Sequence, residues 1–457
     1  MIQITRKLPE FPKVIPEKKD DPDIETKIYE IEVITPMFGG GAEAGIADPA
    51  MPIRASSVRG HLRFWWRATR GANYNNEQDL RQREGEIWGT TDNPSPVIIE
   101  VVQPKEIQYR SPPDYGFFRY GPEVYALFSA KAGEAELIKE NFNFTVIISW
   151  LKEKRLNELR KIENEKLIQQ KKEHKPERID PIENDIEAAF WAWVNFGGIG
   201  ARTRRGCGAL YCKEFAPPDD DIGKWYSDSL KKYQIDKNTP KSWPTLPEKL
   251  RINTNNQIDP LKCWSDVVGG MKDFRQGKVG RNVYSKSFWP EPETIRETIQ
   301  NQNGLKIRPK GRKKTDNRIT VKSFPRAEFG MPIIFELKDE YIGNNTDDDN
   351  IKPTLQPNEK NDRMASPLIL KPIKYQNGCK SLILRLKTNP LDSAYLKPGK
   401  HDLTTGVSLS YNDIVNTANA AYPNSPMRFS RGGKHPGSAL EAFLAYAEEN
   451  GFQEVPK

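Results

Sequence analysis

The feature that most constrains this chain is a glycine- and arginine-rich stretch, FGGIGARTRRGCG, at residues 196–208. Glycine lets the backbone turn sharply and approach a ligand closely, and its N–H groups can then point at an anion. The side chains of Arg202, Arg204 and Arg205 offer forked donors that match phosphate oxygens. The stretch therefore predicts a loop that binds a polyanion. The alternative is a glycine-rich turn whose arginines are merely solvated.

The sequence on either side places this loop between a helix and a strand. Asp180 and Pro181 are typical of a helix start, with Asp180 as the N-cap, and apolar residues follow at helical spacing as far as Gly197, which is expected to end the helix. Residues 209–215 are expected to form a strand that stops at Pro217. Loops that bind mononucleotides or dinucleotides precede a helix, so this order favours an extended nucleic-acid backbone.

A second basic block lies at residues 52–71, PIRASSVRGHLRFWWRATRG. Its apolar residues recur at helical spacing, which predicts an amphipathic helix capped by Ser56 or Ser57 and ended by Gly71. Arginines follow at nearly the same spacing and form a stripe beside the apolar face. Like charges at this spacing repel by a few tenths of a kcal/mol per pair, so we interpret the stripe as a second nucleic-acid contact, with a solvated face as the alternative. The stripe consists of Arg59, Arg63, Arg67 and Arg70.

Composition and charge limit the class of protein. The 457-residue chain has a formal charge of +8 and a pI near 9.0, which favours an anionic partner. Its mean hydropathy is −0.73, it has no apolar run near the ~20 residues of a membrane helix, and its N-terminus lacks a secretory signal. We therefore expect a cytoplasmic protein with no membrane partner. The four cysteines form no Cys-x-x-Cys pair, so neither a disulfide scaffold, a metal site nor a cofactor is expected.

The order of the expected elements predicts an α+β fold. Between residues 27 and 215 the patterns indicate strand, helix, strand, strand, helix and strand, which is the order of a ferredoxin-like (RRM-like) domain. In such a domain the first helix and the loop before the last strand can lie close together, so Arg59 or Arg63 is expected near residues 202–205. The expected organisation is a flexible arm at 1–24, a first ferredoxin-like domain at 25–218 with a charged helical insertion near 151–178, and a second α+β domain at 219–457.

The second half of the chain gives weaker signals. Helices are expected near residues 264–274 and from Ser438, and strands at 332–337, 366–373 and 381–386. Residues 306–326 form a basic run, which is either an exposed loop or a nucleic-acid contact.

The blocks at residues 52–67 and 197–208 resemble the RAMP superfamily of CRISPR effector subunits and, within it, the first subunit of the type III-B Cmr complex. Weaker similarities cover parts of residues 280–292 and 323–373. The resemblance implies two ferredoxin-like RAMP domains and a non-catalytic, RNA-binding role in antiviral defence. It implies CRISPR guide RNA, complementary target RNA or both as partners, together with the other Cmr subunits. The candidate RNA-binding residues are Arg54, Ser57, Arg59, His61, Arg63, Arg67, Gly197, Gly198, Gly200, Arg202, Arg204, Arg205, Arg281 and Arg326.

His61 is the residue on which an enzymatic alternative depends. Other RAMP proteins are metal-independent endoribonucleases that trim CRISPR transcripts, and His61 would serve there as the general acid or base beside Arg59 and Arg63. Those cationic neighbours would lower its pKa. No motif places a second histidine or a tyrosine beside it, so we expect a packed or RNA-contacting His61 and no catalytic residue. The sequence leaves open whether the guide or the target strand is contacted.

Overall fold

The structure of the chain is a computed structural model. It describes residues 21–110 except 42 and 44, 125–127, 137–170, 181–236, 241–281 except 256, 287–303, 306–309, 322–342, 350–399, 405–416, 418, 424–431 and 437–456. Three expectations fall partly or wholly outside these residues: the N-terminal arm, the end of the charged insertion together with Asp180, and most of the basic run at 306–326.

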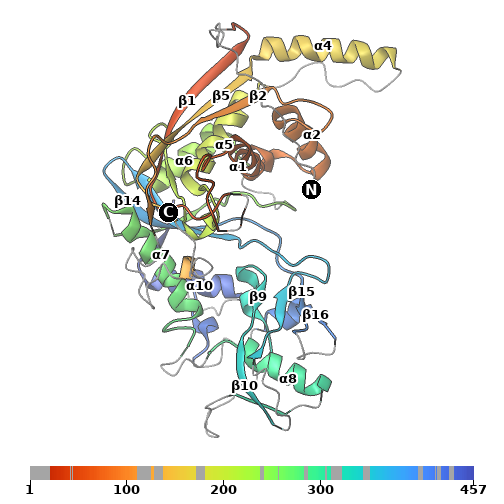
Figure 1. The fold of residues 1–457 in the computed structure, drawn as a ribbon, viewed down its shortest axis with the longest axis vertical. Coiled ribbons are helices and arrows are strands. Elements are labelled where there is room, and N and C mark those ends of the chain that lie inside the picture. The colour runs from red at the N-terminus through yellow and green to blue at the C-terminus, as the bar shows by residue number, and fades with distance from the viewer. Residues whose placement is uncertain are drawn as a thin grey trace, which may run out of the picture.

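The first half is built on an antiparallel sheet with the strand order β2-β5-β1-β6 (Figure 1). Its long strands pair over ten residues, from Ile24 opposite Leu151 to Val33 opposite Phe142. Alternate side chains of these strands are buried, as expected of a sheet with one face on a core. The strands are β1 (Ile24–Val33), β2 (Val97–Val102), β5 (Phe142–Leu151) and β6 (Leu210–Tyr211).

The helices α1 (Ala55–Ala68) and α5 (Glu183–Phe196) pack against each other beside this sheet. The predicted caps of α1 are wrong: Arg54 is the N-cap, Ser56 and Ser57 lie inside the helix, and the helix ends at Thr69 before Gly71. The hydroxyl of Thr69 donates to the carbonyl of Trp65 at 2.7 Å, which satisfies an acceptor in the last turn.

The predicted start of α5 is also wrong, because Ile182 is its N-cap and Pro181 precedes the helix, but its predicted end at Gly197 is confirmed. The strand expected at residues 209–215 is shorter, because the backbone turns after Cys212 and the N–H groups of Phe215 and Ala216 donate to the Cys212 carbonyl.

A second antiparallel sheet, with the order β13-β14-β7-β17, lies in the other half. The helices α7 and α10 pack on one of its faces and share a core with its residues Leu368, Leu370 and Ile383. The elements are β7 (Leu250–Asn253), α7 (Pro260–Arg275), β13 (Leu368–Tyr375), β14 (Gly378–Arg385), α10 (Ala439–Glu449) and β17 (Phe452–Val455).

Helix α5 lies between the two sheets, which explains its sequence. A helix that is apolar all round must be buried all round, and every residue from Ala188 to Phe196 is buried. One core cluster joins the first sheet, α1 and α5 to Ile369, Ile373 and Leu382 on the inner face of the second sheet. The order of layers is therefore sheet, helices, sheet, helices, and the predicted α+β class is confirmed.

The remaining elements extend from this layered centre. Helix α4 (Glu153–Gln169) projects at the top of Figure 1 and lies in the charged segment. Its Arg160 is buried against Glu86. Among the described helices, none is long and apolar enough to cross a bilayer. The other elements are α2 (Glu77–Trp88), β3 (Tyr109–Arg110), β4 (Leu137–Ile138), α6 (Ile222–Lys232), α8 (Glu291–Asn303), β8 (Lys306–Pro309), β9 (Ile333–Ile334), β10 (Leu337–Ile342), β11 (Asn350–Ile351), β12 (Thr354–Gln356), β15 (Ser393–Lys397), β16 (Val407–Ser410) and α9 (Tyr411–Ile414).

Candidate nucleic-acid interface

The glycine loop, residues 197–208, is fixed by its backbone against the segment that follows β1. The N–H of Ala201 donates to the Phe38 carbonyl at 2.6 Å, and the N–H of Gly208 donates to the Pro36 carbonyl at 2.9 Å. Gly200 has φ +82°, and a Cβ atom there would lie 2.7 Å from the Phe38 carbonyl oxygen. The fold itself therefore requires glycine at this position.

Gly197 and Gly198 are equally close to neighbouring atoms. A Cβ atom on Gly197 would lie 2.6 Å from the indole nitrogen of Trp65, and one on Gly198 would lie 2.8 Å from the Gly208 carbonyl oxygen. The three candidate glycines thus have a structural reason to be glycine, and RNA contact by their backbone stays a prediction.

The underside of the loop is held by both halves of the chain. The Thr35 hydroxyl donates to the Gly206 carbonyl at 2.6 Å, and from the second half the Trp264 indole donates to the Arg205 carbonyl at 2.7 Å. The buried Lys371 ammonium on β13 donates to the Gly197 carbonyl at 2.9 Å. The loop is therefore a rigid element at the junction of the two halves.

The three arginines of the loop leave it in different directions. Arg202 is exposed, has a left-handed backbone with φ +58°, and donates to the Ala126 carbonyl at 3.0 Å. Arg204 donates to the Ser366 carbonyl and lies 5.5 Å from the centre of the Phe64 ring. Burial and the neighbouring charge of Arg205 lower the pKa of Arg204. Two of the three guanidiniums are thus half-buried cations rather than solvated ones.

The arginine stripe on α1 has a structural role that the sequence did not reveal. Arg59 donates to the carbonyls of Trp88 and Val97, at 3.2 and 2.7 Å. Arg63 and Arg67 both donate to one oxygen of Glu84 on α2, at 2.8 and 2.6 Å. The carboxylate offsets the repulsion along the stripe, so these arginines fasten α1 to α2 and β2.

The other candidates, Arg281 excepted, are partly or wholly buried. Arg54 donates to the Gly40 carbonyl at 2.7 Å, Ser57 is half-buried, and the His61 ring stacks on Trp193 with 6.0 Å between ring centres. Burial lowers the pKa of His61 to about 4, so the imidazole is neutral at pH 7. Arg326 is buried, whereas Arg281 is exposed.

The two basic blocks are adjacent, and the expected closeness of Arg59 or Arg63 to residues 202–205 stays a prediction. The blocks meet where Arg204 covers the Phe64 ring of α1. Among the described residues, no hydrogen bond or ring contact joins Arg59 or Arg63 to the loop, since both side chains turn towards α2 and β2.

A cluster of side chains beside the loop contains two residues that the sequence analysis missed. The guanidiniums of Arg205 and Arg275 lie 5.7 and 5.9 Å from the centre of the Tyr125 ring, and Arg275 donates to the Tyr125 hydroxyl at 2.6 Å. Arg275 is in the last turn of α7, and the only sequence signal for it is a basic residue near a helix end. We call Tyr125, Arg205, Arg275, Arg281 and Arg326 the Tyr125 cluster.

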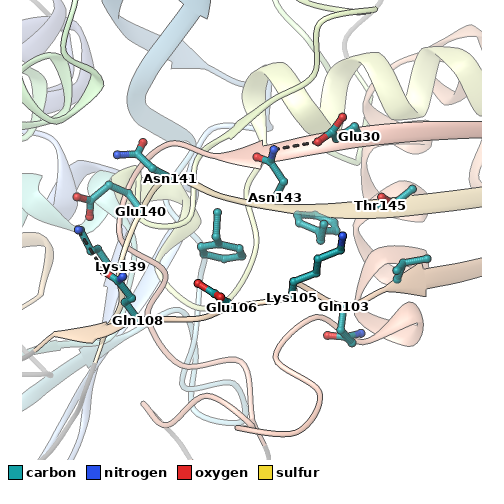
Figure 2. Close-up of a pocket in the computed structure, with 13 residues that line it drawn as sticks. Glu30, Gln103, Lys105, Glu106, Gln108, Lys139, Glu140, Asn141, Asn143 and Thr145 are labelled. Carbon is teal, nitrogen blue, oxygen red and sulfur yellow. Dashed lines mark hydrogen bonds between the residues drawn. The ribbon is translucent and has the colours of Figure 1, made fainter.

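A cavity of about 570 Å³ lies at the edge of the first sheet, on the face away from α5 (Figure 2). In Figure 2, Glu30 and Asn143 point towards each other from β1 and β5, joined by a hydrogen bond of 2.9 Å. The lining mixes Lys105 and Lys139 with three carboxylates, so it does not favour a polyanion. The carboxylates are those of Glu30, Glu106 and Glu140. In the described part of the chain, no group of three or more His, Cys, Asp or Glu side chains could hold a metal ion.

Comparisons with known proteins connect these features to a family. The RAMP superfamily model matches residues 30–211. The CRISPR system Cmr subunit Cmr1-2 of Pyrococcus furiosus is 28% identical over 192 residues, which are 40% of this chain and 92% of that protein.

Solved structures that match this chain include Cmr1 from Pyrococcus furiosus in its apo form, with 16% identity and a TM-score of 0.45 over 85% of this chain and 94% of that one. Another is a chain of the type III-B Cmr-beta complex bound to cognate target RNA, with 12% identity and a TM-score of 0.43 over 81% and 96%. Residues 30–211 therefore match the RAMP superfamily model, and the resemblance to this superfamily and to the first Cmr subunit that the sequence motifs predict is confirmed.

Proposed function

We propose that this chain is a non-catalytic, RNA-binding subunit of a type III-B CRISPR ribonucleoprotein effector complex that acts in antiviral defence. Its partners are CRISPR guide RNA, complementary target RNA or both, and the other subunits of the Cmr complex. The observation that carries the proposal is the rigid glycine loop, which holds Arg204 and Arg205 at the junction of the two halves. Among the described residues, no carboxylate forms a salt bridge with either of these arginines, although a phosphate would suit both.

The same proposal includes two ferredoxin-like RAMP domains, at residues 25–218 and 219–457. The first sheet has the strand order β2-β5-β1-β6, with α1 after its first strand and α5 before its last. The second sheet repeats this scheme with β13-β14-β7-β17, where α7 follows β7 and α10 precedes β17. Two β-α-β-β-α-β units with the same order support an internal duplication, in which α8 and the sheet with the order β16-β15-β12-β9 are insertions.

The state of His61 supports a binding role over an endoribonuclease. A general base works best when its pKa is near the working pH, and burial has moved the pKa of His61 to about 4. Within the described residues, no hydrogen bond orients the imidazole, which lies on the face of Trp193. The endoribonuclease remains the rival function, with His61 as its acid or base.

The test incubates the purified chain with labelled single-stranded CRISPR repeat RNA in EDTA. We expect a shifted band in a native gel and intact RNA in a denaturing gel. Cleavage by the wild-type chain that disappears in His61→Ala would establish the rival function. Absence of binding to any single-stranded RNA, by a chain that melts cooperatively, would refute the RNA-binding role.

A further inference from the structure

The Tyr125 cluster concentrates positive charge at the junction between the loop and the second half. Its arginines come from three separate segments: the loop supplies Arg205, α7 and the turn after it supply Arg275 and Arg281, and the turn before β9 supplies Arg326. Partial desolvation by the surrounding protein atoms lowers the pKa of Arg281, and the charge of Arg326 lowers it further. The arginines are therefore brought together by the tertiary fold, not by their spacing in the sequence.

The cluster has too few anions for its cations. Glu291, which is completely buried, lies 3.2 Å from the guanidinium of Arg326. No carboxylate in the described residues forms a salt bridge with Arg205, Arg275 or Arg281. Holding the buried Arg326 and the half-buried Arg205 and Arg275 around one carboxylate is unfavourable unless a further anion is bound.

Hydrogen-bonding groups in the cluster also lack acceptors. Among the residues that the structure describes, the buried Nη1 of Arg205 and the buried Nε of Arg275 find no acceptor. Guanidinium N–H groups that are removed from water and left unpaired destabilise a fold, so such groups indicate a place for a ligand oxygen. Both arginines also flank the Tyr125 ring, and the phenol accepts a hydrogen bond from Arg275.

We propose that Arg205 and Arg275, supported by Arg281 and Arg326, form a binding site for a phosphate group of RNA beside Tyr125. The inference deepens the RNA-binding role proposed above and rests on it. Phosphate offers several acceptor oxygens and at least one negative charge, which match the forked donors and the unbalanced charge of the site.

The backbone holds the site in place before any ligand binds. The Trp264 indole donates to the Arg205 carbonyl at 2.7 Å, and the Trp289 indole donates to the Arg275 carbonyl at 3.0 Å. Burial would raise the pKa of Tyr125, but the charges of Arg275 and Arg205 outweigh it and lower that pKa. The direction of the shift follows from the positive charge of these same arginines. Preorganised donors of this kind lose little entropy on binding.

The test compares the wild-type chain with Arg275→Gln, Arg275→Lys and Arg205→Gln, and uses Arg81→Gln as a control that removes one exposed charge from α2. Each protein is titrated with one short single-stranded RNA carrying either hydroxyl or phosphate ends. We expect Arg275→Gln and Arg205→Gln to bind about tenfold more weakly or worse, and the control to stay within about twofold of wild type. The affinity of Arg275→Lys should lie between those of the wild-type chain and Arg275→Gln, because lysine keeps the positive charge but lacks the paired donors of a guanidinium.

The two RNAs identify the source of the phosphate. If the site takes an internal phosphate, both RNAs lose affinity equally in Arg275→Gln. If it takes a terminal phosphate, the preference of the wild-type chain for the phosphorylated RNA disappears in the variant. Wild-type affinity for both RNAs in both glutamine variants would overturn the inference while leaving the RNA-binding role intact.

Thermal melting gives a measurement that does not depend on RNA. Inorganic tripolyphosphate should raise the melting temperature of the wild-type chain more than sodium chloride of equal ionic strength does, and should have a smaller effect on Arg275→Gln. Without an anion, Arg205→Gln should melt at or above the wild-type temperature because it relieves repulsion. If the wild-type chain binds no RNA, the proposed function fails. The anion site is then supported or refuted by whether tripolyphosphate raises the melting temperature of the wild-type chain more than that of Arg275→Gln.

Discussion

Lys371 allows a quantitative test of how the two halves of the chain are joined. Its side chain is completely buried on β13, with the ammonium 2.9 Å from the Gly197 carbonyl oxygen and 3.5 Å from that of Val194. These carbonyls at the end of α5 favour the charged form, but burial outweighs them and lowers the pKa from 10.5 to about 7. Folding therefore disfavours the protonated amine.

The sign of the pH dependence follows from this shift. Between pH 7 and 10.5 the unfolded chain keeps the proton that the folded chain has released, so the free energy of unfolding rises with pH. The expected slope is up to about 1.4 kcal/mol per pH unit, which amounts to ~5 kcal/mol between pH 7 and 10.5. Below pH 7 the buried, protonated Lys371 destabilises the fold by this full amount. Lys371→Met should remove the slope. At about pH 6 it should be more stable by ~3 kcal/mol, after ~1–2 kcal/mol is subtracted for the lost hydrogen bonds.

Urea unfolding followed by tryptophan fluorescence, from about pH 6 to about pH 9, measures this difference below the range in which tyrosines ionise. Lys380→Met on β14 is the matched control. The Lys380 side chain is not completely buried, and its ammonium has a carboxylate partner, Asp220, 3.6 Å away. The control should keep the wild-type slope. Parallel pH curves for the wild-type chain and Lys371→Met would show that Lys371 is not desolvated, and the account of the junction would be wrong.

Three further outcomes follow from other contacts. Gly200→Ala should destabilise the chain by more than ~1 kcal/mol, because φ is positive and the new Cβ would meet the Phe38 carbonyl; melting at the wild-type temperature would contradict this. Asp185→Asn should lower the free energy of unfolding by about 3 kcal/mol in urea, since the buried Arg83 loses a buried counter-charge 2.7 Å away and keeps the more exposed Glu86 at 3.3 Å. A change below ~1 kcal/mol would mean that water reaches the pair. Arg204→Ala should reduce the slope of log K against log salt for single-stranded RNA by about 0.7, and an unchanged slope would assign Arg204 to the fold.

The parts of the fold that the sequence predicts are those set by local periodicity. The helices near residues 264–274 and after Ser438, and the strands near 366–373 and 381–386, are present because a stripe of apolar residues must face a core. Helix starts were less predictable. Asp180 and Pro181 form a strong local signal, but tertiary packing begins α5 later, at Glu183.

Contacts between segments distant in the sequence account for what was missed. The sequence pattern indicates no role for Asp185, but its carboxylate accepts hydrogen bonds from the Trp66 indole on α1 at 2.9 Å and from Arg83 on α2 at 2.7 Å. Arg275 likewise acquires its role only when α7 packs beside Tyr125. No spacing rule reports such pairs, because each depends on how the layers stack.

The arginine stripe on α1 shows the limit of an argument from charge alone. Four arginines at helical spacing were interpreted as a surface for RNA, on the ground that a structural helix would alternate its charges. The compensating charge exists but lies on another helix, where Glu84 accepts from both Arg63 and Arg67. In the Tyr125 cluster, no carboxylate of the described residues forms a salt bridge with Arg205 or Arg275. These two arginines lie far apart in the sequence, so no local run of basic residues marks them. A binding site for a polyanion is therefore better recognised by cations that the fold leaves without a carboxylate than by cations that are dense in the sequence.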